Sequence, residues 1–246
     1  MDWPFTHTLA LITKCEFDGE GMRLPCVMDE IQHGQILTPQ SCEFWTKQVF
    51  LAQKHWTRRH PNTPFFTLGM AAYLDGKQAK NKDASTALYR QRILRDASNN
   101  LLQAQFSPLY QQLCQRMSEI FGMPAVLIPT QAALPGFHIH LPHPAFAEDV
   151  ASIHRDLQFQ QVFPNTSFEP EEVITFTLPI SLPPDSGLNL WRKDQKKFYP
   201  YKLGQVVIHS GLLTHQAVLR CAGTVPARIA LQGHGVIRGP ELALYW

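Results

Sequence analysis

The sequence predicts an α+β protein with a mainly β core, in which a jelly-roll pair of sheets is supported by helices from the N-terminal half. Apolar residues recur at helical steps between about residues 38 and 122, and short β-branched runs separated by Pro, Gly, Asn and Asp follow. The 246 residues are 44% hydrophobic and 17% charged, which is typical of a globular domain with a substantial core. We therefore expect a single domain over residues 1–246, with a mainly helical buttress over 1–122 and the β core over 123–246.

The first helix is predicted to begin close to residue 38. Trp45, Val49 and Trp56 follow one another at steps of four and seven residues and would share one helix face. Thr38 has a hydroxyl that can cap the helix, and Pro39 fits the first turn, where no amide donor is needed. The pattern therefore predicts a capped, amphipathic helix.

A second helical pattern covers about residues 84–122. We expect it to divide in two at Ser107 and Pro108, because Ser107 can cap a new helix and Pro108 has no amide hydrogen to donate. Gly122 and Pro124 are typical of the end of a helix. These segments are expected to form the scaffold of the N-terminal half.

Short apolar runs after residue 122 predict about eight strands, which together favour a sandwich or barrel. The last two runs would pair as an antiparallel hairpin around the turn CAGTVP, which places His215 opposite about Leu231. The predicted strands lie near residues 125–129, 136–141, 172–180, 187–191, 197–203, 204–210, 215–220 and 227–237.

Charge and cysteine content argue against several classes of protein. The formal net charge is +2 and the longest basic cluster, WRKDQKK, is interrupted by Asp194, so no nucleic-acid partner is expected. No run of about 18 apolar residues occurs, and no basic stretch precedes the short apolar run near the N-terminus, so we expect no membrane span and no export signal. The scattered cysteines form no CxxC pair and favour a reducing cytoplasm. They are Cys15, Cys26, Cys42, Cys114 and Cys221.

Histidines are frequent in the β half, and one of them lies two residues before an aspartate. His154 and Asp156 in the stretch ASIHRDLQF would leave the same face of an extended chain and can converge on one ion. Two imidazoles and one carboxylate suit a divalent transition metal and leave coordination positions open. The histidines in question are His138, His140, His143, His154, His209, His215 and His234.

The third ligand would come from another strand, and His209 and His215 are the two candidates. His209 lies within the apolar run VVIHS, where a hydrogen-bonded core histidine is common, so we favour His215. In the predicted hairpin, Arg228 would lie about three residues, on the order of 10 Å, from His215 along the sheet. A dicarboxylate that chelates the metal at one end would then reach this guanidinium with the other.

His154, Asp156, His215 and Arg228 resemble the HxD...H...R signature of the Fe(II)- and 2-oxoglutarate-dependent dioxygenase superfamily. The stretches SGLNLW and GQVVIHSGLLTHQAV are also similar to strands of that family, and the resemblance covers about residues 125–240. It implies a double-stranded β-helix core.

The resemblance also implies the cofactors and their ligands. Fe(II) would be held by His154, Asp156 and His215, and 2-oxoglutarate, the cosubstrate consumed with O2, would pair its distal carboxylate with Arg228. Hydroxylation of a small molecule, amino-acid-like or a natural-product intermediate, is the implied reaction. An aspartate at position 156 disfavours the halogenating branch of the superfamily.

The sequence departs from the family pattern two residues after the arginine. Many members have Ser or Thr there, whereas this chain has Ala230. The distal carboxylate would then need another partner, for which Thr175, Thr177 and Gln232 are candidates, or would be bound by Arg228 alone.

Three further residues are candidates for contact with the substrate. His138 and His140 alternate with apolar residues and would face one side of a strand, either the interior near the metal or solvent and the helices. Trp191, at the end of a strand and before a basic turn, would contact an acidic or amphiphilic substrate, or would pack structurally.

Other functions remain open at this stage. The same ligand set serves enzymes that hydroxylate protein side chains, so a polypeptide substrate is an alternative. A cupin would use the HxH pair at His138 and His140, but the first glutamate after His140 is Glu148, farther than the cupin motif requires. A non-catalytic binding module would not need a complete set of metal ligands.

Overall fold

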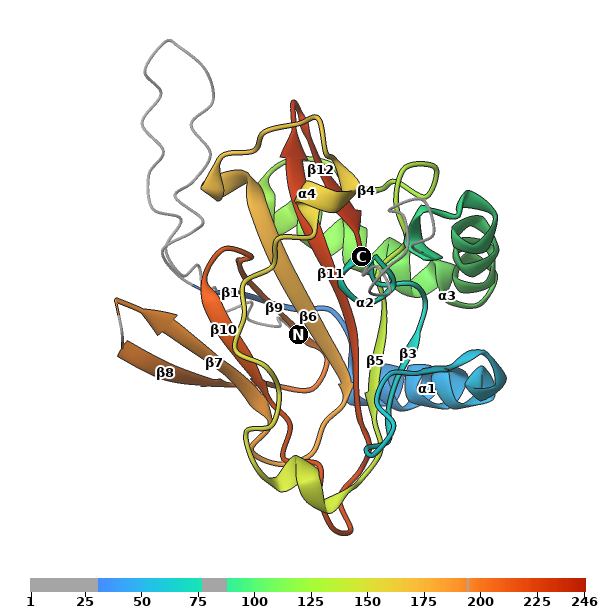
Figure 1. Ribbon diagram of the computed structural model, residues 1–246, viewed down its shortest axis with the longest axis vertical. Coiled ribbons are helices and arrows are strands. Elements are labelled where there is room, and N and C mark those ends of the chain that lie inside the picture. Colours follow the sequence, from blue (N-terminus) through green and yellow to red (C-terminus); the bar gives the residue numbers. More distant parts are fainter. Residues whose placement is uncertain (1–30, 77–87, 194) are drawn as a thin grey trace, which may run out of the picture.

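The computed structural model describes residues 31–76, 88–193 and 195–246 (Figure 1). Cys15, Cys26 and the apolar run near the N-terminus lie outside these residues. The strands are β1 (Gln32–Gln35), β2 (Thr57–Arg58), β3 (Phe65–Leu68), β4 (Ala125–Leu127), β5 (Gly136–His140), β6 (Val173–Ser181), β7 (Gly187–Arg192), β8 (Gln195–Pro200), β9 (Gln205–Ser210), β10 (Thr214–Val218), β11 (Arg228–Arg238) and β12 (Glu241–Tyr245). The α-helices are α1 (Pro39–Leu51), α2 (Ala72–Asp75), α3 (Arg92–Phe121) and α4 (Phe159–Val162).

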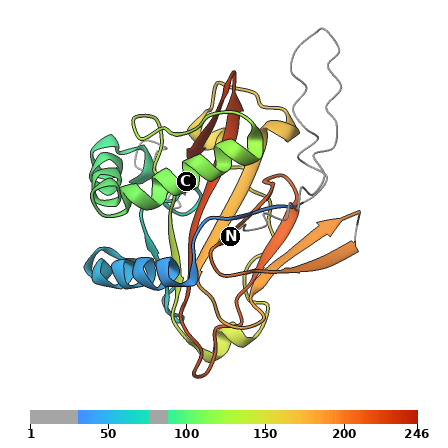
Figure 2. The ribbon, with the colours of Figure 1, turned by 180° about the vertical axis from the view of Figure 1, so that it is seen from behind.

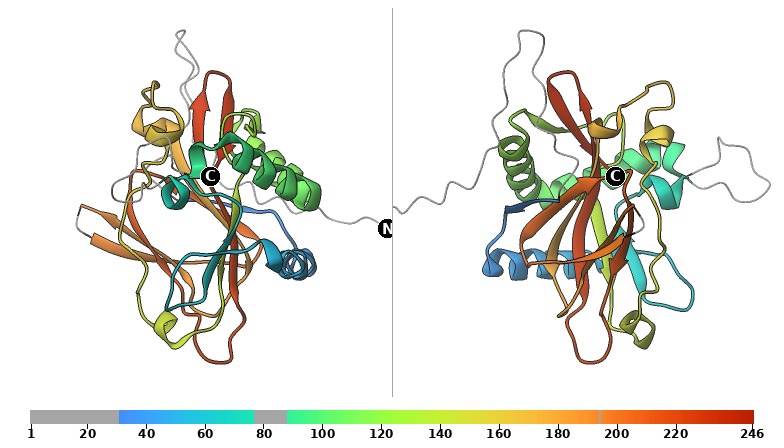
Figure 3. Two further views of the ribbon diagram at one scale, coloured as in Figure 1. Left: turned by 45° about the vertical axis from the view of Figure 1, so that its right-hand side comes forward. Right: turned by 90° about the vertical axis from the view of Figure 1, so that its left-hand side faces the viewer.

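The strands form two sheets, and their pairing is antiparallel except between β4 and β12. A nine-stranded sheet has the order β1-β9-β6-β11-β5-β3-β2, and in addition β12 pairs with β11 and β4 pairs with β12. A three-stranded sheet has the order β10-β7-β8. Helices α1 and α3 lie on one side of the large sheet and the small sheet lies on the other (Figures 2 and 3). The chain is therefore mostly antiparallel β-sheet supported by helices, as predicted, with the two long helices on one side of the large sheet.

The two faces of the large sheet differ in chemistry because side chains alternate along each strand. On β5, Phe137 and Ile139 join the apolar core that also contains Trp45 of α1 and Phe106 of α3. The alternate residues of the same strand face away from the helices. This second face carries polar side chains, among them His138 and His140, that adjoin the site described below.

Helix α1 begins as the sequence predicts. The Thr38 hydroxyl accepts a hydrogen bond from the Ser41 amide at 3.2 Å, and Pro39 occupies the first turn. The predicted division at Ser107 and Pro108 is wrong, since α3 continues through both residues. The Ser107 hydroxyl donates to the Gln103 carbonyl at 2.5 Å within the helix, instead of capping a new one.

Gly122 ends α3 in the left-handed conformation, with φ of 66°. Buried side chains such as Phe106 and Leu113 lie along α3 on both sides of Pro108. Their packing on the sheet holds the helix together across the proline, where local sequence alone predicts a break.

All eight predicted strand regions contain strands, but the sequence interpretation missed the strands of the N-terminal half. Strands β1 and β3 pair with β9 and β5, respectively, so this half contributes to the large sheet as well as supporting it. Strand β12 was also missed. These strands have only four or five residues, which offer too few alternating positions to identify them.

The predicted hairpin between the last two runs is wrong. Strand β10 pairs with β7 in the small sheet, whereas β11 lies between β5 and β6 in the large sheet. Residues 219–227 cross from one sheet to the other, and Arg220 and Gly223 within them have positive φ values of 49° and 76°. The chain therefore leaves the strand direction at a turn that the sequence interpretation took for a hairpin.

No helix in the described residues is long and apolar enough to span a bilayer. Cys42, Cys114 and Cys221 are free thiols.

Substitution of Gly136 by Ala is expected to destabilise the fold by about 2 kcal/mol or more. A Cβ atom at this position would lie 2.1 Å from the Trp246 ring and 2.7 Å from the Leu68 carbonyl oxygen. Urea unfolding monitored by circular dichroism measures the change. As a control, Gly223→Ala adds a Cβ with no neighbour within 4 Å and carries only the strain of positive φ, about 1 kcal/mol. Equal losses in the two variants would contradict the packing argument.

Candidate metal centre

The first two site residues lie on the loop between β5 and β6, and this loop is fastened to β10. His154 and His215 exchange two backbone hydrogen bonds, of 3.0 and 2.9 Å. The Asp156 amide donates to the Gly211 carbonyl at 2.7 Å. His154 and His215 are thus register partners in an isolated antiparallel bridge, and their side chains leave the same side of it. Because Asp156 is two residues beyond His154 in extended backbone, its side chain joins them.

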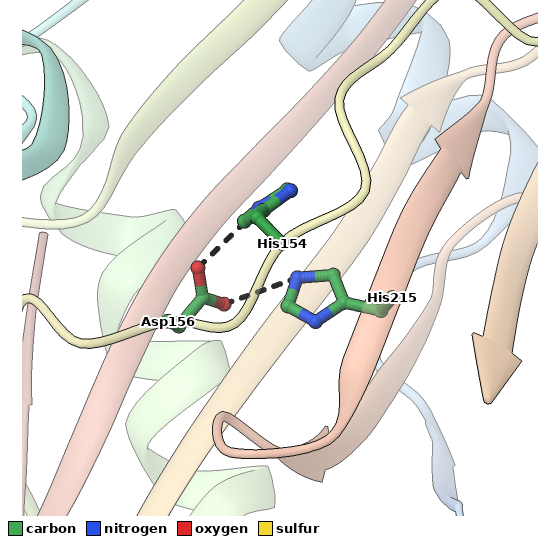
Figure 4. A group of neighbouring side chains, drawn as sticks. All are labelled: His154, Asp156 and His215. Atoms are coloured by element: carbon green, nitrogen blue, oxygen red, sulfur yellow. Dashed lines mark ion pairs between the residues drawn. The ribbon is translucent and has the colours of Figure 1, made fainter. Parts of the chain in front are cut away.

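The three side chains converge on one point (Figure 4). His154 Nε2 lies 3.5 Å from Asp156 Oδ1, and His215 Nε2 lies 3.3 Å from Asp156 Oδ2. One potential ligand atom from each residue falls within 4.8 Å of the others. In the described part of the chain, these residues are the only group of three or more His, Cys, Asp or Glu side chains with this arrangement. The two-residue spacing in the sequence therefore predicted a real convergence.

Backbone carbonyls fix the orientation of both imidazoles. His154 Nδ1 lies 2.9 Å from the Ser152 carbonyl oxygen, and His215 Nδ1 lies 2.8 Å from the Leu213 carbonyl oxygen. A carbonyl oxygen only accepts, so each Nδ1 carries a proton, and Nε2 is the nitrogen left to bind a metal ion. Both Nε2 atoms face the Asp156 carboxylate. This is the tautomer that a metal ligand requires, held by the hydrogen bond that the opposite nitrogen makes.

The carboxylate is held by two neutral side chains. Gln158 donates to Asp156 Oδ1 at 3.0 Å, and the Thr175 hydroxyl donates to Oδ2 at 2.6 Å. Thr175 in turn lies 3.1 Å from Nδ1 of the buried His234. Burial opposes ionisation of Asp156, but the facing His215 and His234 outweigh it and hold the pKa of Asp156 well below its ordinary value. The acid is therefore an anion at neutral pH, in the form that binds a cation.

His215 shows the reciprocal effect. Burial disfavours its charged form, but the Asp156 carboxylate outweighs that cost and raises the pKa of His215 above its ordinary value. The side chain of His154 is 39% exposed, whereas those of Asp156 and His215 are 3% and 4% exposed. The group is therefore open to solvent on the side of His154.

The polar face of the large sheet continues the site away from the three residues. Arg228 is the register partner of His140, and Ala230 is the register partner of His138, so these four residues share a face. The Arg228 guanidinium is buried, and its carbon lies 5.6 Å from the centre of the Tyr201 ring. Arg228 has no carboxylate partner among the described residues, and its Nε has no hydrogen-bond partner there.

The histidines beside Arg228 are neutral. Burial, reinforced by the Arg228 charge, lowers the pKa of His138 to about 3 and that of His140 well below its ordinary value. The Nε2 of His138 hydrogen-bonds to the hydroxyl of Tyr73, and Nδ1 of His140 has no partner among the described residues. A buried cation with neutral neighbours is costly unless an anion joins it. This buried polar face is therefore chemically suited to a carboxylate.

Position 230 has no hydroxyl to assist Arg228, and Thr175 is one of the residues expected to replace it. The Thr175 hydroxyl, however, already donates a hydrogen bond to Asp156. Burial raises the pKa of Tyr201, although the Arg228 charge and a hydrogen bond with Thr177 partly oppose this. Tyr201, which the sequence interpretation did not single out, therefore brings a buried hydroxyl to the neighbourhood of Arg228. Gln232 hydrogen-bonds to His138.

The remaining predicted residues do not belong to the three-residue group. His209 is buried with its ring centre 4.7 Å from that of His215, and its Nδ1 lies 2.9 Å from the Ser210 carbonyl oxygen. Trp191 is the register partner of Thr214, on the side of the small sheet opposite to His215, and lines a surface pocket. The role of Trp191 in binding substrate stays a prediction.

The sequence interpretation includes His234 among the candidate histidines and assigns it no role. The alternation of Arg228, Ala230, Gln232 and His234 at two-residue steps along β11 was the available signal, because it places all four on one face.

Solved structures share this fold. An N-substituted L-amino acid dioxygenase from Burkholderia ambifaria AMMD aligns with a TM-score of 0.56 and 12% identity, over 88% of this chain and 86% of the dioxygenase. The same type of enzyme from that organism in complex with alpha-KG aligns with a TM-score of 0.55 and 11% identity, over 88% of this chain and 86% of the other. This chain and the dioxygenase therefore share a fold. No protein-family model matches the sequence, and no curated protein matches it.

Replacement of Thr175 by Val is expected to weaken binding of a divalent metal ion by about 10- to 100-fold, because the hydrogen bond that orients Asp156 Oδ2 is lost. Anaerobic calorimetric titration with Fe(II), or with Co(II) in its place, measures the affinity. Thr175→Ser keeps the hydroxyl and is the matched control. Wild-type affinity in Thr175→Val would show that the hydroxyl does not support the carboxylate.

The free energy of unfolding is expected to fall as the pH drops below about 6.5, by about 1.4 kcal/mol per pH unit for each histidine that protonates only on unfolding. Burial lowers the pKa of both His138 and His209 to about 3, so between that value and about 6.5 these residues bind protons in the unfolded chain but not in the folded one. His215, with a raised pKa, acts in the opposite direction. Urea midpoints at different pH values measure the slope. His138→Gln should reduce it and exposed His60→Gln should not; a flat profile for the wild type would contradict the lowered pKa values.

Proposed function

We propose that this protein is a non-haem iron oxygenase that couples oxidative decarboxylation of 2-oxoglutarate to hydroxylation of a small molecule. The proposal rests on two groups that both lie inside the protein, namely a set of possible metal ligands and a buried arginine. A group of two Nε2 lone pairs and one carboxylate faces a common point, and a buried guanidinium without a carboxylate partner lies on the adjoining sheet face. In this proposal the two sheets form a double-stranded β-helix, as one domain supported by the N-terminal helices.

The donor set fits Fe(II). His154 and His215 offer neutral imidazole nitrogens, Asp156 offers an anionic oxygen, and this combination leaves coordination positions for other ligands. Iron, 2-oxoglutarate and O2 together supply oxidation of an unactivated C–H bond. The chain itself keeps Asp156 ionised through its neighbours and keeps both imidazoles in the metal-binding tautomer through backbone carbonyls.

The guanidinium fits the distal carboxylate of 2-oxoglutarate. Arg228 offers a planar set of donors in a buried site, where a charge-assisted hydrogen bond is strong. The ring of Tyr201 lies beside it, so the Tyr201 hydroxyl takes the role that a serine or threonine at position 230 has in other members of the family. His140, directly across the strand pair, lines the same space, and His138 follows it toward the metal ligands. We assign these histidines to the surroundings of the bound cosubstrate, and we expect other residues to contact the substrate.

One structural neighbour supports a proposal for the substrate class. The N-substituted L-amino acid dioxygenase supports an amino-acid-like small molecule with a carboxylate, and hydroxylation is the default outcome. A cytoplasmic location accords with free thiols at Cys42, Cys114 and Cys221.

A cupin is less compatible with the geometry. Its HxH ligands would be His138 and His140, but neither belongs to the three-residue metal group. Both are neutral neighbours of Arg228, whose charge would repel a metal cation at that position.

With Fe(II), ascorbate and O2, the purified protein is expected to convert 2-oxoglutarate to succinate slowly even without its substrate. Arg228→Ala should raise the KM for 2-oxoglutarate by about 30-fold or more, because truncation of one partner of a buried charged pair costs about 2 kcal/mol or more. Asp156→Ala should abolish turnover. Succinate is measured by mass spectrometry.

Arg238→Ala is the matched control, since Arg238 lies on the same strand but is paired with Gln131 at the exposed end. Metal affinity measured in parallel should be unchanged in Arg228→Ala and lost in Asp156→Ala. Absence of succinate from a metal-loaded wild-type protein, in the presence of cell extract as a source of substrate, would reject the proposal.

A further inference from the structure

We propose that the basic pocket formed by Arg155, Arg192 and Lys193 beside Trp191 binds the carboxylate of an amphiphilic small-molecule substrate. The inference rests on the proposed function and specifies the substrate class of the same site. It identifies the residues that would recognise the substrate, as distinct from those that hold iron and 2-oxoglutarate.

The pocket combines charge with apolar surface. It has a volume of about 600 Å³ and contains cationic, aromatic, aliphatic and neutral polar side chains, but no acidic one among the described residues. A space of this size fits a small molecule. The lining residues are Arg155, Trp191, Arg192, Lys193, Gln195, Leu212, Leu213 and Thr214.

Three of the cations that line the pocket have no ion-pair partner among the residues that the structure describes. Arg155, Arg192 and Lys193 form no ion pair with the described carboxylates, whereas the nearby Lys196 and Arg220 both pair with Asp149. Arg155 donates through Nε to the Thr214 hydroxyl at 3.2 Å, which orients its guanidinium at the pocket. Within the described part of the chain, cations without an ion-pair partner are therefore grouped around the pocket.

The pocket adjoins the metal centre through the chain itself. Arg155 is the residue between His154 and Asp156, and Thr214 immediately precedes His215. Because side chains alternate, Arg155 and Thr214 lie on the other side of the bridge that carries the metal ligands. His154 is the exposed member of the group, so the metal centre opens on the bridge that also borders the pocket. A molecule anchored in the pocket would extend over this edge toward the metal.

Trp191 provides an apolar wall whose position is fixed. The Lys196 ammonium lies 5.6 Å from the centre of the Trp191 ring and also pairs with Asp149 at 3.3 Å. Leu212 and Leu213 add aliphatic surface from the turn that precedes β10. A ligand with an anionic end and an aromatic or alkyl body matches this arrangement, because guanidinium groups bind carboxylates and an indole ring packs on apolar surface.

The test uses N-benzoylglycine, a small aromatic carboxylate, and its neutral amide as probes. The complete protein is loaded anaerobically with Fe(II) and saturating 2-oxoglutarate, so that Arg228 is occupied and turnover cannot occur. Calorimetry and tryptophan fluorescence report binding. The acid is expected to bind at least about tenfold more tightly than the amide, and Arg192→Ala or Lys193→Ala should weaken the acid by about tenfold. Trp191→Phe should remove the fluorescence change.

Lys197→Ala is the matched control. Lys197 belongs to the same hairpin but lies 4.9 Å from the centre of the Tyr199 ring and does not line the pocket. Equal affinity for the acid and the amide, no binding of the acid at about 10 mM, or equal losses in Lys197→Ala and Arg192→Ala would overturn the inference. The visible band of bound Fe(II) and 2-oxoglutarate is recorded in the same samples. A normal visible absorption band in a protein that does not bind the acid would contradict this inference alone. Absence of the band would contradict the proposed function.

Discussion

The whole site depends on the antiparallel bridge between His154 and His215. Two backbone hydrogen bonds fasten an otherwise irregular loop to the first residues of β10, and they place both imidazoles on one side, with Asp156 between them. The two histidines are about 60 residues apart in the chain, and this bridge is the contact that brings their side chains together. The Nδ1 hydrogen bonds to backbone carbonyls then decide which nitrogen each ring presents. Backbone geometry thus sets the ligand positions, and side-chain contacts refine them.

The second constraint is the alternation of the large sheet. Strands β5 and β11 send apolar residues such as Phe137 and Leu231 toward the helices and polar residues such as His138 and Arg228 toward the small sheet. The apolar face provides the core that stabilises the fold. The polar face is buried by the rest of the protein, and this burial keeps the histidines neutral. Arg228 stays charged because a guanidinium is too basic to lose its proton in a protein, and it has no carboxylate partner among the described residues. The same alternation of side chains therefore accounts for both the stability of the fold and the chemistry of its polar face.

Much of this arrangement was readable in the sequence. The strand regions followed from their β-branched runs, and the convergence of His154 and Asp156 followed from their two-residue spacing. His215 was preferred to His209, and it is the residue that joins the group. The reason given for Arg228 was wrong, however, because β10 and β11 do not form a hairpin. Arg228 instead lies on the polar face through its pairing with β5, at the position opposite to His140.

The sequence does not show which strands from distant parts of the chain become neighbours in the sheets. Tyr201 approaches Arg228, and Thr175 supports Asp156, only because strands from separate parts of the chain are neighbours in the sheets. Local patterns identify a strand but not the strand beside it. The continuity of α3 through Pro108 is a similar case, since packing on the sheet outweighs the local signal for a break.

The most direct measurement of the central claim is a crystal structure of the protein grown anaerobically with Mn(II), an oxygen-stable substitute for Fe(II), and 2-oxoglutarate, with the metal located by its anomalous scattering. The account predicts one metal ion within about 2.3 Å of Nε2 of His154, Nε2 of His215 and one oxygen of Asp156, with the distal carboxylate of 2-oxoglutarate on Arg228. A metal ion bound elsewhere, for example by His138 and His140, or a 2-oxoglutarate that does not contact Arg228, would contradict it.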